Sequence, residues 1–319
     1  MTLPGYNHKF GQQIMTDAEG VDIDRAFLAH YHIDAADAVA ESDTAVMALT
    51  TLEAEARSIT PGLVSPAVPR NVKIDASTAI TTKVKIHGTD FAGQVISEEL
   101  QLTGTDAVAG NLAFKTITKV DLPARTNTPA KQTETIQVTA GCGTSGDIAV
   151  AVTATTLLGA KSGASVTVTL DNTEHSGADD VAAAVVEALN EDADISAVFT
   201  ASVTGDDDDT VLLTANEYAA NDSSLAIAFT VNSTQVTVGS STNGTSGTAE
   251  DKVSVGLGKK LGIPYKLYAD ELVILKLLNK AVEAPTQGVV TADATDLSKN
   301  VYTPNGDIGS KDVDLYIMV

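Results

Sequence analysis

The chain has 319 residues, a formal net charge of −22 and a single cysteine. Such an acidic surface repels phosphate backbones and anionic lipid headgroups, so neither a nucleic acid nor a membrane is an expected partner. The lone Cys142 excludes an intrachain disulfide, so the fold must be held by packing. Abundant Val and Thr favour strands, and abundant Gly and Asp favour turns. We therefore expect a mainly β protein.

Residues 1–26 are polar and irregular, but they include apolar side chains that could be buried, namely Tyr6, Phe10, Ile14 and Met15. Two interpretations stay open: a disordered tail, or an arm that orders only against a neighbouring subunit. No secretory signal is visible at this end, and no apolar run is long enough to span a bilayer. The product is expected to stay in the cytoplasm until it is assembled or released.

Residues 27–58 are rich in alanine, and their apolar residues predict one face of a helix: Val39, Val46, Leu49 and Leu52. Thr60-Pro61-Gly62 ends this segment sharply. Prolines in the stretch Leu63–Arg70 predict an extended linker. Residues 1–58 are thus expected to form an N-terminal arm and a helical segment.

From Asn71 the pattern changes to period two. Short apolar alternations run to Pro123, separated by turn signals such as Gly88-Thr89-Asp90 and Gly104-Thr105-Asp106. Short strands at regular spacing predict an antiparallel β-sandwich or barrel domain.

Residues 135–250 are predicted to be a separate small α+β domain of β-α-β-β order. A strand with alternating Val and Leu is followed by a helix that Ser176 can cap, with buried positions at Val181, Val185, Val186 and Leu189. Phe199–Val203 and Thr210–Thr214 predict a hairpin, and Leu225–Val231 predicts a further strand. Flanking Gly/Ser/Thr stretches at Gly141–Gly146 and Gly239–Gly247 are predicted to be linkers.

The charge of residues 135–250 also marks a separate domain. This stretch carries sixteen acidic residues against one base, Lys161, and therefore most of the net charge. After residue 251 strand-like alternation resumes at Val253 and Val255, and returns at Val289–Ala292 and Val313–Val319, while Leu272–Leu278 fits a strand or a helix. We therefore expect a discontinuous β-domain over 59–134 and 251–319, interrupted by an inserted acidic domain.

Two stretches resemble recurrent segments of tailed-bacteriophage structural proteins. They are Lys83–Pro123, KVKIHGTDFAGQVISEELQLTGTDAVAGNLAFKTITKVDLP, and Val253–Leu267, VSVGLGKKLGIPYKL. Ala294–Lys299 (ATDLSK), followed by a final β-stretch, fits the same group. Within the insert, ASVTVTL, GADDVAAAVVEALN and TVLLTANEYAANDSSLAIAF are similar to an accessory module of such proteins.

The resemblance implies a structural virion protein of the capsid decoration, or cement, type. Its implied location is the capsid surface, after assembly in the host cytoplasm. Its implied partners are the major capsid protein and neighbouring copies of itself, and a trimer fits common capsid symmetry sites. These proteins define no catalytic residues, so none are carried over.

Two groups of residues are candidates for metal ligands. His30 and His32 could place two imidazoles on one face of a strand, but no third ligand is visible nearby in the sequence. Asp206–Asp209 offers many carboxylate oxygens, yet it lacks the spaced ligand loop of an EF-hand, and a solvated hairpin tip is the favoured interpretation. No metal ligand is assigned.

The candidates for catalysis are weak. Gly256–Gly262 lacks the spacing of a phosphate loop and is predicted to be a tight turn. Cys142 has no visible activating base and is expected to be exposed or half-buried. Glu98 and Glu99 should point to opposite faces of a strand. The chain is therefore not expected to be an enzyme, and no catalytic residue, cofactor-binding residue or cofactor is assigned.

One alternative function stays open beside capsid decoration. The chain could be a head-fibre or tail-associated protein whose insert binds the host surface. A wall-degrading hydrolase is set aside, because no acid/base pair stands out in the sequence.

Overall fold

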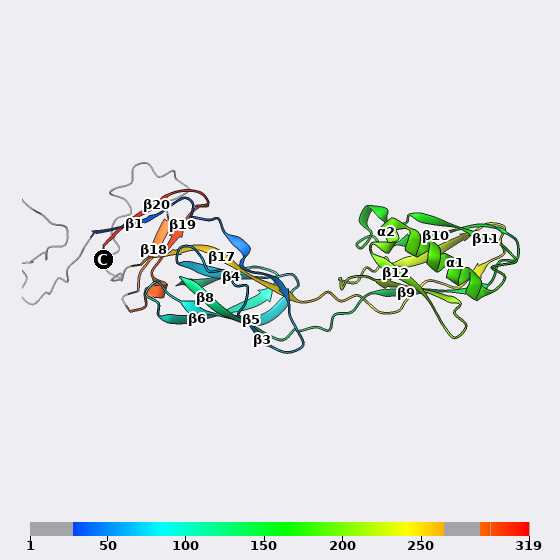
Figure 1. The fold of residues 1–319 in the computed structure, drawn as a ribbon, viewed down its shortest axis with the longest axis horizontal. Helices are drawn as coiled ribbons and strands as arrows, with labels where there is room; N and C mark the ends of the chain where they lie inside the picture. Colours follow the sequence, from blue (N-terminus) through cyan, green and yellow to red (C-terminus); the bar gives the residue numbers. More distant parts are fainter. Residues whose placement is uncertain (1–27, 265–287, 294, 319) are drawn as a thin grey trace, which may run out of the picture. The chain divides into compact units, whose positions relative to one another are not determined.

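The computed structural model describes residues 28–264, 288–293 and 295–318. It contains 48% strand and 9% helix, and its antiparallel sheets include a half-barrel (Figure 1). The predicted mainly β class is therefore confirmed. The chain divides into two compact units: unit 1 is Met1–Thr126 with Asp251–Val319, and unit 2 is Asn127–Glu250. Unit 2 starts at Asn127 rather than at the predicted residue 135, because the chain entering it already pairs through Ala130 with Thr248 on the chain leaving it.

The described strands of unit 1 pair antiparallel, and several pairs join strands far apart in the sequence, such as β1 with β20 and β2 with β17. Its elements are β1 (Leu28–Ile33), β2 (Ser42–Thr51), β3 (Arg57–Ile59), β4 (Arg70–Ala76), β5 (Ile80–Thr89), β6 (Val95–Gly104), β7 (Val108–Phe114), β8 (Thr116–Leu122), β17 (Lys252–Gly262), β18 (Gly288–Thr291), the 3-10 turn η4 (Leu297–Lys299), β19 (Val301–Pro304) and β20 (Val313–Met318).

Two sheets build the centre of unit 1. One runs β18-β19-β17-β4-β7, with β2 also paired to β17, and the other runs β3-β8-β5-β6. One cluster of buried side chains contains residues of both sheets, for example Val72 of β4, Val255 of β17, Val84 of β5 and Val120 of β8. The two sheets therefore share a core, which is the packing expected of a sandwich or partly open barrel.

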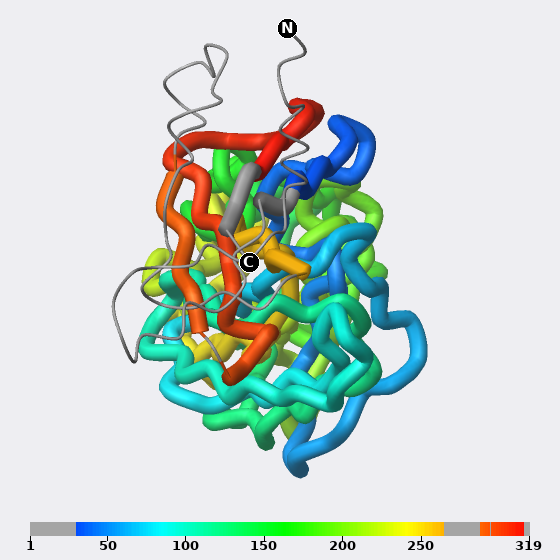
Figure 2. The backbone as a smooth tube through the Cα atoms, turned by 90° about the vertical axis from the view of Figure 1, so that its left-hand side faces the viewer, coloured from blue at the N-terminus to red at the C-terminus, as the bar shows by residue number. Residues whose placement is uncertain are grey.

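A smaller core lies beneath the strand pair β1 and β20, which joins the two ends of the described chain (Figure 2). Ile33 of β1 and Leu315 of β20 are buried, and they pack with Leu261 of β17 and Tyr302 of β19. Because side chains alternate along a strand, His30 and His32 of β1 and Asp314 of β20 face outward and are exposed.

The predicted helix over 27–58 is wrong. The described part of this segment forms β1, β2 and β3. Of the expected helix face, Val46 and Leu52 are buried, but Val39 and Leu49 are 45% and 49% exposed. Pairing of β2 with β17 satisfies its backbone and buries Val46 and Met47, so tertiary contacts override the helix propensity of its alanines.

The predicted tight turn at Gly256–Gly262 is also wrong, because these residues belong to the long strand β17. β17 pairs with β4 on one side and with β2 and β19 on the other. A side chain at Gly256 would overlap the backbone carbonyl of Ser42 in β2. These glycines therefore permit close approach of neighbouring strands rather than reversal of the chain.

Unit 2 has more strands than the predicted β-α-β-β order. Its elements are β9 (Thr133–Ala140), β10 (Gly146–Thr153), the 3-10 turn η1 (Gly159–Lys161), β11 (Ser165–Leu170), α1 (Ala178–Glu191), α2 (Ala193–Ser196), β12 (Phe199–Thr204), β13 (Thr210–Ala215), β14 (Ala226–Val231), β15 (Thr237–Val238) and β16 (Thr242–Asn243). The sheets run β11-β10-β14 and β12-β13-β9-β15, with β16 also paired to β9. The predicted hairpin is confirmed as β12–β13. The predicted linkers lie within this unit instead: Gly141–Gly146 connects β9 to β10, and Gly239–Gly247 contains β16.

Helix α1 lies against the strands of unit 2 and closes its core (Figure 1). Val181, Val185 and Leu189 are fully buried as predicted, whereas Val186 is only partly buried. Ser176 does not cap the helix; Gly177 is the N-cap, and its N–H donates to the Asp180 carboxylate at 3.1 Å.

Cys142 is buried rather than exposed or half-buried. The residue is 3% exposed and belongs to the core of unit 2, and its thiol donates to the Thr144 carbonyl at 3.1 Å. A small buried thiol with its own acceptor fits a packing role.

Some predicted features lie wholly or partly outside the described residues: the arm at 1–26, the segment Leu272–Leu278, the last three residues of Val253–Leu267, the first residue of Ala294–Lys299 and the last residue of Val313–Val319. The remaining part of Ala294–Lys299 is described below.

Candidate functional site

Asp206–Asp209 form the turn between β12 and β13, as the hairpin interpretation requires. Asp209 turns back onto the sheet, where it accepts a hydrogen bond from the Gln137 amide at 2.7 Å, and this bond lowers its pKa. In the described part of the chain, these four aspartates do not form a group of three converging ligand atoms. Their placement supports a solvated turn.

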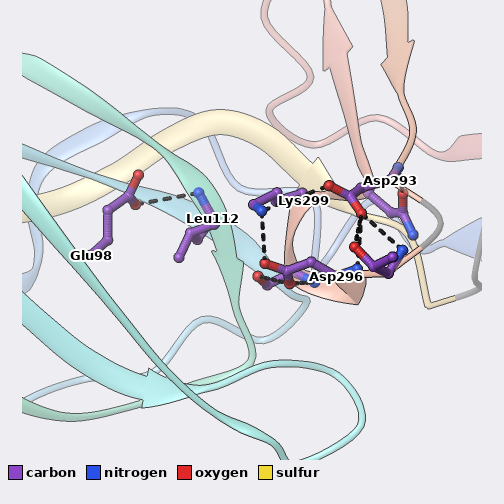
Figure 3. Close-up of polar contacts among 8 residues, drawn as sticks. Glu98, Leu112, Asp293, Asp296 and Lys299 are labelled. Carbon is purple, nitrogen blue, oxygen red and sulfur yellow. Dashed lines mark hydrogen bonds and ion pairs between the residues drawn. The ribbon is translucent and has the colours of Figure 1, made fainter. Parts of the chain in front are cut away.

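Glu98 links the two sheets of unit 1. Its carboxylate accepts hydrogen bonds from the backbone N–H groups of Asn111 and Leu112 in β7 at 2.6 and 3.3 Å. Figure 3 shows the bond from Leu112. β6 and β7 belong to different sheets, so the Glu98 side chain, rather than a backbone carbonyl of β6, accepts these two N–H groups of β7. Burial raises the pKa of Glu98, although both N–H donors oppose the shift. Glu99, the next residue, is exposed, so the prediction that the two carboxylates point apart is confirmed.

The described part of the ATDLSK stretch, residues 295–299, forms a capped turn. Asp293, just before it, accepts from the Thr295 N–H and hydroxyl at 2.8 and 2.7 Å, which holds the pKa of Asp293 at about 2. Asp296 accepts from the Ser298 N–H at 3.1 Å and caps η4. Lys299 lies 3.7 and 3.2 Å from the two carboxylates (Figure 3). These polar groups satisfy one another, so the motif stabilises a turn.

Asp121 of β8 is the acceptor in a second charged cluster. It receives hydrogen bonds from Ser58 at 2.6 Å and His87 at 2.7 Å, and Lys119 lies 3.1 Å away. Burial raises the pKa of Asp121, but the three partners outweigh burial and lower the pKa to about 2. The cluster ties β3 and β5 to β8, which lies between them.

The lowered pKa of Asp121 predicts an acid-dependent loss of stability in unit 1. The stabilisation is complete above the unfolded-state pKa of about 3.9 and is lost as the pH falls toward 2. We expect Asp121→Asn to unfold at a lower temperature than the wild type at pH 5, with the difference shrinking by pH 2.5. Thermal unfolding by calorimetry at both pH values measures this, and a difference that stays constant would contradict the assignment.

Arg70 is the largest fully buried polar side chain among the described residues, with 1% exposure. Its guanidinium donates through Nε to the Gly258 carbonyl and through Nη1 to the Val39 carbonyl, while Nη2 has no hydrogen-bond partner among the described residues. Burial lowers the pKa of Arg70, and the acids nearby oppose that shift. Arg70 lies at a recess of about 420 Å³ lined by Ala40, Glu41, Lys259 and Asn305–Ile308. Two bases and two acids share this recess, so its charges balance locally.

The strand pair β1–β20 brings together the donor atoms of His30, His32 and Asp314. Asp314 stands opposite His32 in the ladder, and its Oδ1 lies 2.7 Å from His30 Nε2 and 2.8 Å from His32 Nδ1. His32 Nε2 lies 3.1 Å from Asp34. Hydrogen bonds to Asp314 and then to Asp34 raise the pKa of His32, and the two imidazoles lower the pKa of Asp314.

The sequence identified both histidines of this group but not the carboxylate. Asp314 lies 282 residues from His32 along the chain, so only the pairing of β1 with β20 reveals it. A second set, His32 with Asp34 and Asp312, also converges. In the part of the chain that the structure describes, these are the groups of three His, Cys, Asp or Glu side chains close enough to share an ion.

A scan of protein-family models and a search of curated proteins each found no match. None of the helices in the described ranges is long and apolar enough to cross a membrane.

Proposed function

We propose that the chain is a structural virion protein that binds the outer surface of a tailed-bacteriophage capsid and stabilises it. Its binding partners are the major capsid protein and neighbouring copies of the chain. The proposal assigns it no catalytic residue and no cofactor.

The observation that carries the proposal is where the phage-like segments lie in the fold. Lys83–Pro123 supplies most of β5 and all of β6, β7 and β8, and the described part of Val253–Leu267 supplies nearly all of β17. These strands form the main core of unit 1. The resemblance therefore concerns the framework of the unit, which supports a shared architecture more strongly than a shared surface motif would.

A decoration protein acts through binding energy. A protein that binds the assembled shell but not its separated subunits stabilises the shell by mass action, by about 2.7 kcal/mol per site at a free concentration 100 times Kd. Unit 1 is suited to this task because its antiparallel sheets share a core that does not depend on unit 2. The acidic unit 2, with its own core, is free to serve a separate role.

The proposal predicts that capsids assembled without the chain lose their contents at a lower temperature and survive osmotic shock less often. Adding the purified chain back should restore the resistance in a saturable way. Release of packaged DNA on heating, followed with an intercalating dye, measures the effect. Equal resistance with and without the chain would rule out a stabilising role.

The alternative, a head-fibre or tail-associated protein, assigns host binding to unit 2, and the fold offers a clean test. Thr126 donates through its N–H and hydroxyl to the Asp251 carboxylate at 2.9 and 2.8 Å, so unit 1 holds both ends of the excised segment together. Residues 127–250 can therefore be replaced by a short Gly-Ser linker. Capsid stabilisation should persist in this variant; loss of cell binding with stabilisation intact would assign unit 2 to the host surface.

A further inference from the structure

The strand pair β1–β20 carries His30, His32 and Asp314 on one face and packs with its other face on the smaller core of unit 1. Ile33 and Leu315 on its inner face are 2% and 1% exposed and belong to the smaller core of unit 1. His30 and His32, two residues apart, share the outer face with Asp314. The backbone positions of the three side chains are therefore fixed by packing on the opposite side of the ribbon.

The donor atoms already lie near the spacing of a metal site. One nitrogen of each imidazole and one oxygen of Asp314 lie within 4.8 Å of one another. Zinc bonds of 2.0–2.1 Å in a tetrahedron place neighbouring donors about 3.4 Å apart. The carboxylate must withdraw slightly from the two nitrogens, and small side-chain rotations suffice because the three side chains are 48%, 39% and 47% exposed.

Asp34 supplies the outer contact that a metal-binding histidine needs. A ligating imidazole usually donates its other N–H to a carboxylate, which fixes the tautomer and orients the ring. When an ion displaces the proton between His32 Nδ1 and Asp314, Nε2 can keep donating to Asp34, which lies 3.1 Å away, so that Nδ1 supplies the lone pair to the ion. This arrangement is independent of the three donors and presents His32 as a ligand.

We propose that His30, His32 and Asp314 bind a divalent transition-metal ion of the zinc type, with Asp34 orienting His32 and water completing the coordination. Two imidazoles and one carboxylate suit zinc, copper or nickel better than magnesium or calcium, which prefer all-oxygen sites. The bound ion would cross-link β1 to β20 and so fasten the two ends of the described chain to each other (Figure 2). The set with Asp312 offers one imidazole, which makes it the weaker site for such an ion.

Calorimetric titration of the full chain with zinc chloride, with magnesium chloride as a comparison, tests the site. We expect saturable zinc binding near one ion per chain and at least tenfold weaker magnesium binding. Asp314→Asn and His32→Ala should each weaken zinc binding at least tenfold, and Asp34→Asn by about tenfold, as for other outer carboxylates. His175→Ala, which removes an imidazole of unit 2 that contacts its own turn, should leave binding unchanged.

Hydrogen exchange gives a second readout. Zinc should slow exchange of the β1 and β20 amides in the wild type and in His175→Ala, but not in Asp314→Asn. The proposal is overturned if zinc affinity is the same in Asp314→Asn and His32→Ala as in the wild type, or if magnesium binds equally well. A loss caused by Asp312→Asn but not by His30→Ala would assign the ion to the other set and also overturn it. Asp34→Asn keeps all three ligands, so its zinc affinity tests the site even if a ligand variant fails to fold. An affinity equal to that of the wild type would contradict the role of Asp34 in orienting His32.

Discussion

Gly256→Ala is expected to destabilise unit 1 by about 3 kcal/mol or more, which is the upper range for overpacking a close-packed core. The added methyl group would overlap the Ser42 carbonyl and touch the backbone of Asp43. Both are backbone atoms of β2, so no side-chain rotation can relieve the clash, and β2 must move away from β17. Calorimetry should show a lower transition temperature for unit 1, and faster hydrogen exchange in β2 should locate the damage.

Gly93→Ala is the matched control for this change. Gly93 has φ +80° and has nothing within 4 Å of the position of an added Cβ. Its replacement should cost only the backbone strain of a left-handed residue, about 1–2 kcal/mol. If Gly256→Ala were no worse than Gly93→Ala, the close approach of β2 and β17 would not hold in solution.

The sequence predicts strands well where one face of the strand is buried. Val84 and Ile86 alternate with exposed or half-buried residues in β5, and the turn signals around them mark where β5 and β6 end. Helix α1 is predicted equally well from the sequence, because Val181, Val185 and Leu189 repeat at helical spacing beside polar positions. In both elements the local pattern and the tertiary environment agree.

The sequence fails where a distant strand decides the structure. The alanines around β2 favour a helix locally, and its pairing with β17, about 200 residues later, has no local signal. From the sequence alone the glycines of β17 predict a turn, whereas in the structure they allow neighbouring strands to pack closely. The sequence does not reveal Asp314 as the third member of the His30–His32 group for the same reason, since Asp314 meets His32 only through the ladder between β1 and β20. Long-range antiparallel pairing is thus the common cause of these errors.

Arg70→Ala is expected to cost unit 1 about 3–5 kcal/mol, the range seen when a buried, hydrogen-bonded charged group loses its partner or leaves a cavity. The Arg70 guanidinium connects the Val39 carbonyl, which precedes β2, to the Gly258 carbonyl in β17. Truncation leaves both carbonyls without this donor, and an unpaired buried acceptor carries its full desolvation cost. Chemical denaturation monitored by circular dichroism measures the loss.

Three further substitutions separate the causes of that loss. Arg70→Lys keeps the charge, but one ammonium cannot reproduce two donors in a fixed fork, so we expect an intermediate loss. Arg70→Met keeps the volume without a donor; if the hydrogen bonds matter, it should remain at least 1 kcal/mol below the wild type. Arg57→Ala, which removes a guanidinium with 34% exposure paired to Glu53, should cost about 1 kcal/mol or less. Wild-type stability in Arg70→Met would mean that the apolar stem of Arg70, rather than its two bonds to distant carbonyls, fastens the N-terminal segment to the central sheet.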